Sequence, residues 1–418
     1  MYYQRDIENY IKTASNHFEA VVIYGARQVG KSTTVRHLFS KEFANVTLDD
    51  PDELDLARSN PKGFLDIHPW PLLIDEVQKA PILLNLIKKK IDEQREDVLK
   101  GVASKKLMYV LTGSNRFELQ EGVAESLAGR AAVIEMNSFT QMEAQGIQGS
   151  LFRPDIGSLL EKEKSKKVPF AGQTAIFERI FRGGMPGIVA DGTPREIFFK
   201  SYLETYLEKD VRKLLSASSE MTFRRFLSYL ALRTGQQVNY EVFAREIGID
   251  SATVKRWMSI LETSGIIMFL EPYMASLSKR IIKAPKLYFM DTGLCAYLCK
   301  WPNAEMLSDC AMAGAFFETF VVSEIAKSFC NFGQDPKNTL FYYRDIDQKE
   351  IDLIYEEPDG IYPIEIKKGF FPSKPTKNFN VLEKYQIKAK PGLVISNTDK
   401  IRPINDSSYS LPVYLLGA

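Results

Sequence analysis

The chain has 418 residues, a formal net charge of +1, 45% hydrophobic residues and 26% charged residues. This balance is typical of a soluble globular protein and argues against extended disorder. The length allows two or three domains of about 100–200 residues each. Because the net charge is close to zero, overall charge predicts neither a nucleic-acid nor a membrane partner, and contact with nucleic acid would need a local basic face.

The four cysteines and three histidines are too few and too scattered to predict a zinc site, so we expect buried, reduced thiols. The cysteines are Cys295, Cys299, Cys310 and Cys330. The N-terminus lacks the basic-then-apolar pattern of a signal peptide, and no apolar run approaches the roughly 20 residues that span a bilayer. We therefore expect a cytoplasmic protein with no membrane partner.

The first part of the chain alternates short apolar runs with helical stretches. A β-branched run, AVVIY, leads into a glycine loop, and the residues after the loop have the pattern of a helix. Alternating strands and helices predict a parallel α/β sheet. The expected strands are 20–24, 71–74, 107–112 and 132–136, and the expected helices are 32–39 and 82–98.

The glycine loop GARQVGKS, residues 25–32, matches the phosphate-binding pattern G-x-x-x-x-G-K-[ST] in full. Glycines let backbone N–H groups approach the phosphates, Lys31 would reach the β- and γ-phosphates, and Ser32 would place a hydroxyl on Mg²⁺. The predicted cofactors are ATP and Mg²⁺. The residues expected to bind them are Gly25, Ala26, Arg27, Gln28, Val29, Gly30, Lys31, Ser32, Thr33 and Asp75.

The run LLIDE supplies the predicted catalytic acids. A buried strand that ends in two carboxylates would let Asp75 hold the magnesium shell and Glu76 polarise the attacking water, although solvated acids at a strand end are the alternative. In the LTGSN run, Ser114 or Asn115 could sense the γ-phosphate, with a plain turn equally open. Arg130 could neutralise charge in cis or from a neighbouring subunit, or be an ordinary surface arginine.

Residues 240–247, a tight turn at Gly248 and residues 251–263 predict two helices, and apolar runs at 265–270 and 286–290 predict strands, as in a winged helix-turn-helix. Duplex DNA is one expected partner and a docked protein is the other. The side chains that could contact DNA are Ser251, Thr253, Lys255 and Arg256, with Arg245, Lys279, Arg280 and Lys283 beside them.

The chain after residue 310 predicts an apolar helix at 314–329 followed by a strand-rich region. The strand-like runs are 339–343, 350–355, 361–366 and 392–395, with a helix near 380. Asp352 and the pair Glu365–Lys367 interrupt apolar strands. They resemble the D…(D/E)-x-K motif of restriction-endonuclease-like nucleases, in which two carboxylates hold Mg²⁺. The alternatives are a solvated edge strand and a binding module that no longer cleaves.

Glu318 and Glu324 lie on the apolar helix that precedes these strands. The nuclease-like motif includes an acid before the strands. We therefore expect Glu318 to join Asp352, Glu365 and Lys367.

Four motifs in order, GARQVGKS, IDEVQKAP, LTGSN and SLAGR, resemble the predicted AAA+ ATPases of bacteria and archaea. GGMP (183–186), YLETYLEKDV (202–211) and KAPKLYFMDTGL (283–294) are similar to later markers of that family. The resemblance implies an AAA+ core, a winged helix and a nuclease-like C-terminal domain. The predicted fold class is thus α/β, with an AAA+-like P-loop NTPase domain (1–173), a helical winged helix-turn-helix region (174–309) and an α/β restriction-endonuclease-like domain (310–418).

The main hypothesis is an ATPase that couples its nucleotide state to a nucleic-acid-associated C-terminal region, with or without nuclease activity. The competing hypothesis is a nucleotide-dependent switch that recruits a protein partner and has an inactive nuclease-like domain. A metabolic kinase is disfavoured by the Asp75–Glu76 pair and by the appended helix-turn-helix.

Overall fold

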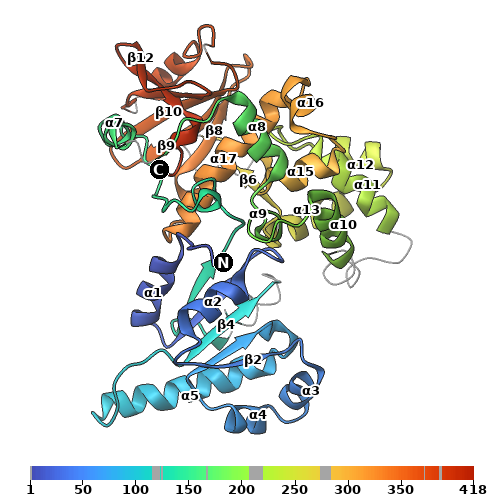
Figure 1. Ribbon diagram of the computed structural model, residues 1–418, viewed down its shortest axis with the longest axis vertical. Coiled ribbons are helices and arrows are strands. Elements are labelled where there is room, and N and C mark those ends of the chain that lie inside the picture. The colour runs from blue at the N-terminus through green and yellow to red at the C-terminus, as the bar shows by residue number, and fades with distance from the viewer. Residues whose placement is uncertain are drawn as a thin grey trace.

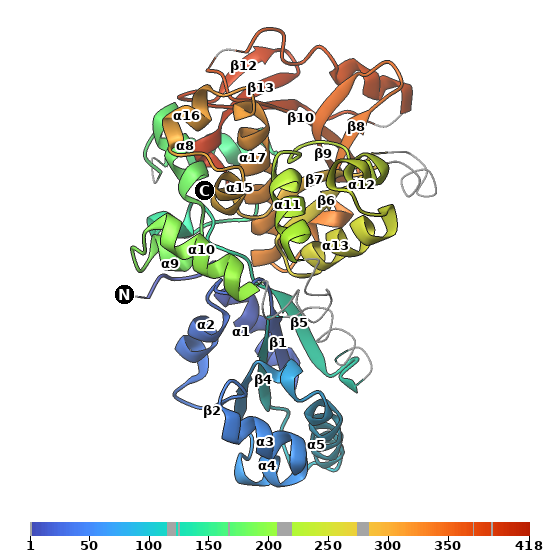
Figure 2. The same ribbon diagram turned by 90° about the vertical axis from the view of Figure 1, so that its right-hand side faces the viewer.

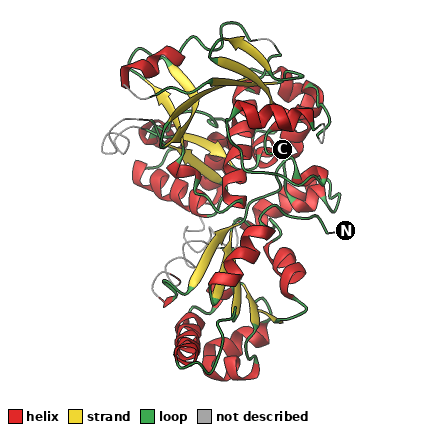
Figure 3. Ribbon diagram, turned by 90° about the vertical axis from the view of Figure 1, so that its left-hand side faces the viewer, coloured by secondary structure: helices red, strands yellow, loops and turns green. Residues whose placement is uncertain are grey.

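The computed structural model (Figure 1) separates the chain into a lower α/β part and an upper part in which helices lie beside a second sheet. Figure 3 shows one group of strands in the lower part of the molecule and further strands in the upper part, with helices between them. The described residues are 2–114, 123, 126–165, 168–206, 220–273, 284–370, 372–385 and 388–418.

The N-terminal sheet has five strands, and all four of its pairings are parallel. Its strand order is β2-β3-β4-β1-β5. The strands are β1 (Ala20–Tyr24), β2 (Ala44–Thr47), β3 (Leu72–Asp75), β4 (Tyr109–Gly113) and β5 (Ala131–Glu135). The predicted parallel α/β domain is therefore present.

Helices cover both faces of this sheet, which explains why β1 is buried at every residue instead of alternating. Val21 and Ile23 of β1 pack in one apolar cluster with α1 and α2, whereas Ala20 and Val22 pack in another with α5. The helices of this part are α1 (Glu8–His17), α2 (Lys31–Phe39), α3 (Pro51–Ser59), α4 (Pro61–Ile67) and α5 (Ile82–Leu99). Helix α7 (Ile156–Lys164) lies instead beside the C-terminal sheet (Figure 1), where Glu163 accepts the backbone N–H of Ile401 at 2.6 Å.

The middle of the chain is helical, and Figure 2 shows its helices grouped above the N-terminal sheet. Helices α12 (Tyr240–Ile247) and α13 (Ser251–Thr263) have the predicted bounds, because side chains of Asn239 and Asp250 cap their N-termini. The antiparallel pair β6 (Ile267–Leu270) and β7 (Lys286–Phe289) follows. The other helices are α8 (Gln173–Arg182), α9 (Pro186–Val189), α10 (Arg195–Tyr206), α11 (Glu220–Ala231), α15 (Thr292–Leu298) and α16 (Ala304–Asp309).

Helix α17 (Ala313–Asn331) contacts β5, β7, α8 and β10, so it joins all three parts of the chain. The C-terminal sheet has six strands in the order β12-β13-β11-β10-β9-β8. These strands are β8 (Leu340–Arg344), β9 (Glu350–Glu357), β10 (Gly360–Lys367), β11 (Gly392–Ser396), β12 (Arg402–Asn405) and β13 (Ser408–Pro412). The last two were not predicted.

Two expectations need correction. The helix expected near residue 380 is a 3₁₀ segment, Phe379–Tyr385. All four cysteines are free, but burial is complete only at Cys295; the other three are partly exposed. None of the helices within the described ranges is long and apolar enough to cross a bilayer.

The GGMP segment crosses closely over the residues that follow β5. Phe139 donates its backbone N–H to the carbonyl of Gly184 at 2.8 Å, and Gly184 donates its own N–H to Asp291 at 2.9 Å. A Cβ at Gly184 would overlap the carbonyl oxygen of Phe139. A side chain at residue 184 therefore requires the two backbones to separate.

We expect Gly184→Ala to lower the free energy of unfolding by about 1–3 kcal/mol, because overpacking two backbones forces them apart. Denaturant unfolding of the full chain measures this change. Gly314→Ala is the matched control, since a Cβ at Gly314 on α17 meets nothing within 4 Å and alanine favours helix. Equal stability of the two variants would contradict the prediction.

Candidate functional site

The glycine loop runs from the end of β1 to the start of α2 in a conformation that requires glycine at two positions. Gly25 has φ +152° and a Cβ there would overlap the backbone carbonyl of Met136, while Gly30 has φ +96° at the N-terminus of α2. Without side chains at these two positions, an anion can approach the backbone of the loop beside the N-terminus of α2. This geometry is typical of an anion-binding site.

Lys31 is buried at the first position of α2, and its ammonium donates to the carbonyl oxygens of Gly25 at 3.0 Å and Ala26 at 2.8 Å. The charge is thus held inside the loop, where phosphate oxygens would compete with these carbonyls. Among the other loop residues, Val29 is buried, Arg27 is partly exposed and Gln28 is exposed. Thr33 is exposed on α2.

Asp75 ends β3 directly opposite the start of α2. Its Oδ1 accepts hydrogen bonds from Ser32 Oγ at 2.9 Å and from the Thr112 hydroxyl, and Arg36 lies 3.8 Å from Oδ2. A hydroxyl and a carboxylate in contact supply the oxygen ligands that Mg²⁺ prefers. Ser32 and Asp75 therefore fit the predicted role of holding the magnesium ion of a nucleotide. Thr112 was not predicted.

Glu76 follows Asp75 in the left-handed backbone region, with φ +58° and ψ +42°. Its Oε2 accepts from Ser114 Oγ at 3.0 Å and from the side-chain amide of Gln78. A non-glycine residue in this region carries strain of about 1–3 kcal/mol and is typical of functional sites. Ser114 thus lies beside Glu76, whereas Asn115 falls outside the described residues.

Arg130 lies too far from the glycine loop to neutralise phosphate charge within its own chain, so that prediction is wrong. Arg130 precedes β5 at the amino edge of the sheet, whereas the glycine loop follows β1 at the carboxyl edge. Its guanidinium donates to both carboxylate oxygens of Asp92, at 2.6 and 3.0 Å. Because all strands are parallel, the whole length of the sheet separates Arg130 from Lys31. A contribution to a neighbouring subunit stays a prediction.

Arg5 is a residue that the sequence patterns did not indicate. It is buried and donates to the carbonyl oxygens of Val29 at 2.9 Å and Asn137 at 2.8 Å, while its Nε donates to Glu143 at 2.9 Å. The N-terminal segment thereby fastens the glycine loop to the residues after β5. No local pattern could reveal this contact, because its partners lie 24 to 138 residues away.

A second cluster of charged residues lies on the C-terminal sheet, where β9 and β10 pair antiparallel. Lys367 lies 3.1 Å from Asp352 and 2.6 Å from Glu365, and Asp352 also accepts the backbone N–H of Ile366 at 2.8 Å. Burial and the neighbouring Asp352 raise the pKa of Glu365 to about 7. The structure therefore brings the three predicted motif residues together.

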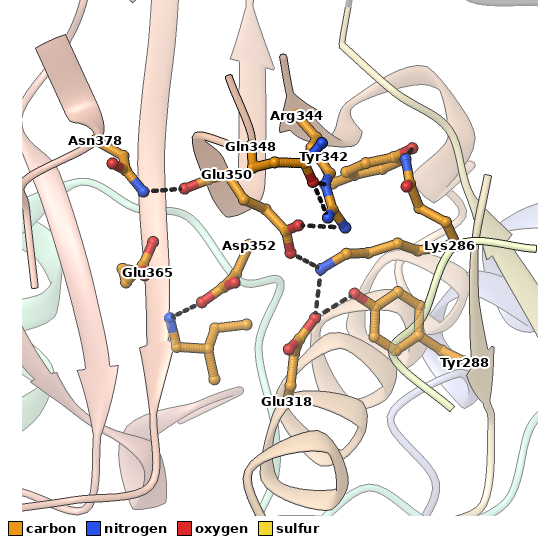
Figure 4. A network of polar contacts seen from close by, with 12 residues as sticks. Lys286, Tyr288, Glu318, Tyr342, Arg344, Gln348, Glu350, Asp352, Glu365 and Asn378 are labelled. Atoms are coloured by element: carbon orange, nitrogen blue, oxygen red, sulfur yellow. Dashed lines mark hydrogen bonds and ion pairs between the residues drawn. The ribbon is translucent and has the colours of Figure 1, made fainter. Parts of the chain in front are cut away.

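Glu318 on α17 faces the same cluster, but its direct partners come from β7 (Figure 4). It accepts from Lys286 Nζ at 2.9 Å and from Tyr288 Oη at 2.6 Å, and Lys286 also lies 2.6 Å from Glu350. Burial raises the pKa of Glu318. We call Glu318, Glu350, Asp352 and Glu365 the acidic cluster. Glu350 and Lys286 were not predicted.

Asp352 and Glu365 were predicted to hold a metal ion, but in the structure their carboxylates pair with a lysine. Throughout the described part of the chain, no three His, Cys, Asp or Glu side chains are arranged to hold a metal ion together. The carboxylates instead pair with lysines. Glu324 lies outside the cluster, because it accepts the backbone N–H of Gln141 at 2.6 Å and pairs with Lys327.

The helix-turn-helix residues lie partly within the described ranges. Lys255 and Arg256 are exposed on α13, and the Lys255 ammonium lies 5.2 Å from the ring centroid of Tyr240. Arg245 is exposed and pairs with Glu246 at 3.3 Å. Ser251 and Thr253 lie in the first turn of α13, where Thr253 donates its backbone N–H to the N-cap residue Asp250 at 2.8 Å. Lys279, Arg280 and Lys283 fall outside the described residues.

Three family models match successive parts of the chain: an AAA domain at residues 17–145, a domain of unknown function (DUF8612) at 173–305 and another (DUF4143) at 313–416. The first part of the chain is therefore a P-loop domain of the AAA type, the ATP-binding domain of ATPases. It is followed by sequence that matches families without an assigned function.

Two uncharacterized proteins, one from Mycobacterium bovis and one from Mycobacterium tuberculosis, are each 26% identical to the chain over 412 residues. The match covers 98% of this chain and 83% of theirs. Among solved structures, a Walker-type ATPase of Pyrococcus abyssi is similar over 71% of this chain and 96% of its own, with 13% identity and a TM-score of 0.43. DnaA from Aquifex aeolicus is similar with 11% identity and a TM-score of 0.25, over 61% of this chain and 85% of its own.

Proposed function

We propose that this protein is a magnesium-dependent ATPase whose nucleotide state acts on a nucleic-acid-associated C-terminal region. The observation that carries the hydrolytic part is the position of Glu76, held by Ser114 next to the Ser32–Asp75 pair. We further propose three domains, at 1–173, 174–309 and 310–418.

Each residue of the site has a role that its contacts support. The loop backbone and Lys31 bind the phosphates, and Ser32 with Asp75 holds Mg²⁺, which neutralises phosphate charge when bound. Glu76 orients the attacking water and accepts its proton, as a carboxylate fixed by two donors can do. Ser114 keeps Glu76 in place and therefore acts as a positioning residue.

We expect Glu76→Gln to lower kcat for ATP hydrolysis by about 10²–10⁴-fold, because a positioned general base contributes about that much. Nucleotide affinity should change little, since Glu76 does not belong to the phosphate-binding loop. Phosphate release and equilibrium binding of an ATP analogue measure the two effects. Glu96→Gln, at an exposed glutamate on α5, is the control. Hydrolysis by Glu76→Gln at the wild-type rate would disprove the assignment.

We also propose that α12, α13 and the strand pair β6–β7 form a winged helix that contacts duplex DNA. The exposed Lys255 and Arg256 on α13 support this proposal. Glu262 and Glu271, which lie on the same side as Lys255, favour the competing role of docking a protein. The two lysine and arginine side chains favour DNA as the partner, and the two glutamates favour a protein.

If DNA is the partner, the full chain should bind a duplex with an affinity that falls as salt rises, since cationic side chains release counterions. Lys255→Ala and Arg256→Ala should each weaken binding and reduce the salt slope by about 1. Fluorescence anisotropy measures this, with Lys90→Ala on α5 as the control. Absence of binding at low salt would favour the protein partner.

Cleavage of nucleic acid is a second candidate function, favoured by the contacts that join Asp352, Glu365 and Lys367. With ATP and Mg²⁺ or Mn²⁺ present, the full chain should cut DNA or RNA, and Asp352→Ala and Lys367→Ala should abolish cutting. Lys368→Ala is the matched control, because that lysine donates to the Ser308 carbonyl instead of a carboxylate. Absence of cleavage would favour the nucleotide-dependent switch, and cutting that survives both substitutions would indicate a contaminant.

A further inference from the structure

The acidic cluster receives one of its cations from outside the C-terminal sheet. Lys286 is the first residue of β7, in the middle region of the chain, and its side chain is 3% exposed. Its ammonium lies 2.9 Å from Glu318 and 2.6 Å from Glu350, and Figure 4 shows it between these two carboxylates. The strand pair therefore places a fixed positive charge among the acids.

The charges of the cluster are almost balanced in this arrangement. The four carboxylates of the cluster face three cations, which are Lys286, Lys367 and Arg344. A divalent cation added to this set would leave a net positive charge in a buried place, which is unfavourable unless one cation leaves. Lys286 is the cation supplied by another part of the chain.

Among the described residues, one carboxylate oxygen of the cluster has no hydrogen-bond partner. Glu365 is 7% exposed, and its Oε2 is buried without a hydrogen bond, although its Oε1 pairs with Lys367. A buried anionic oxygen is costly when it lacks a donor or a cation. This oxygen is therefore a ligand that a divalent cation could use once one of the present cations has left.

The strand that carries Lys286 pairs with a strand that begins beside the glycine loop. Gly265 lies two residues before β6, and a Cβ there would be 3.5 Å from the backbone nitrogen of Ala26. At the other end of the pair, Leu270 of β6 lies opposite Lys286. The four-residue strands span about 10 Å. A short rigid element thus contacts the ATP site at one end and the acidic cluster at the other.

We propose that Lys286 closes the acidic cluster by occupying it as an internal counter-ion, and that nucleotide at the glycine loop withdraws Lys286 through the strand pair β6–β7 so that a divalent cation can bind. A lysine and a divalent cation compete for the same carboxylates, so one excludes the other. This inference rests on the proposed function, in which the cluster binds a cation to act on nucleic acid.

Binding of Mn²⁺ to the full chain without nucleotide tests the competition, with free Mn²⁺ measured by electron paramagnetic resonance. Lys286→Met should bind Mn²⁺ at least about tenfold more tightly than the wild type, because the competing charge is gone. The double variant Lys286→Met/Asp352→Asn should lose this gain while its glycine loop is intact, so it separates the cluster from the ATP site. Lys390→Met, at a lysine paired with Glu357 and Asp359, should bind like the wild type.

Two results would overturn the inference, and they differ in their consequences. If the wild type binds Mn²⁺ as tightly as Lys286→Met, the cluster is a cation site and Lys286 does not close it. If neither binds Mn²⁺ at the cluster, the proposed nuclease function fails as well.

Labelling of lysines in the unaltered chain tests the link to nucleotide without a substitution in the core. Lys286 should resist acetylation in the free protein, and a non-hydrolysable ATP analogue with Mg²⁺ should raise its labelling several-fold, as read by mass spectrometry. Lys390 serves as the internal reference and should not change. The increase should be absent in Lys31→Ala. Equal labelling of Lys286 with and without the analogue would overturn the link.

Discussion

The structure depends on how the glycine loop is enclosed by backbone from other parts of the chain. Gly25 lies against the carbonyl of Met136, Gly265 lies against Ala26, and Arg5 donates to the carbonyl of Val29. The contact at Gly25 leaves no room for a side chain, and the contact of Gly265 with Ala26 brings the helical region against the loop of the AAA-type domain. A change in the loop on binding phosphate must therefore displace its neighbours, since packed interiors transmit strain.

Helix α17 carries this constraint to the C-terminal sheet. The helix is buried on nearly all sides. Its two glutamates contact different parts of the chain: Glu324 accepts a hydrogen bond from Gln141 beside the AAA-type domain, and Glu318 accepts one from Lys286 in the acidic cluster. Buried ion pairs contribute little net stability, but breaking one is costly. They thus define which arrangement of the parts is populated more than how stable the chain is.

The sequence predicted correctly those helices and strands whose ends are marked by neighbouring residues. The bounds of α12 and α13 follow from capping residues and a glycine turn, and those of β1 and α2 follow from a β-branched run before a glycine loop. The prediction failed where tertiary context decides, as at the 3₁₀ segment Phe379–Tyr385. It also failed for Arg130 within its own chain, because a residue beside a strand does not reveal which edge of the sheet it occupies.

By itself the sequence predicted the glycine loop and the roles proposed for it, because the glycines, Lys31 and Ser32 are contiguous and the proposed phosphate contacts follow from backbone geometry. It also determined which strands carry Asp75 and Asp352. Only the tertiary structure decided that Arg5 fastens the loop and that Lys286 enters the acidic cluster. Lys286 and its partner Glu350 lie far apart in the chain, and only the packing of separate elements brings such charges into one low-dielectric place.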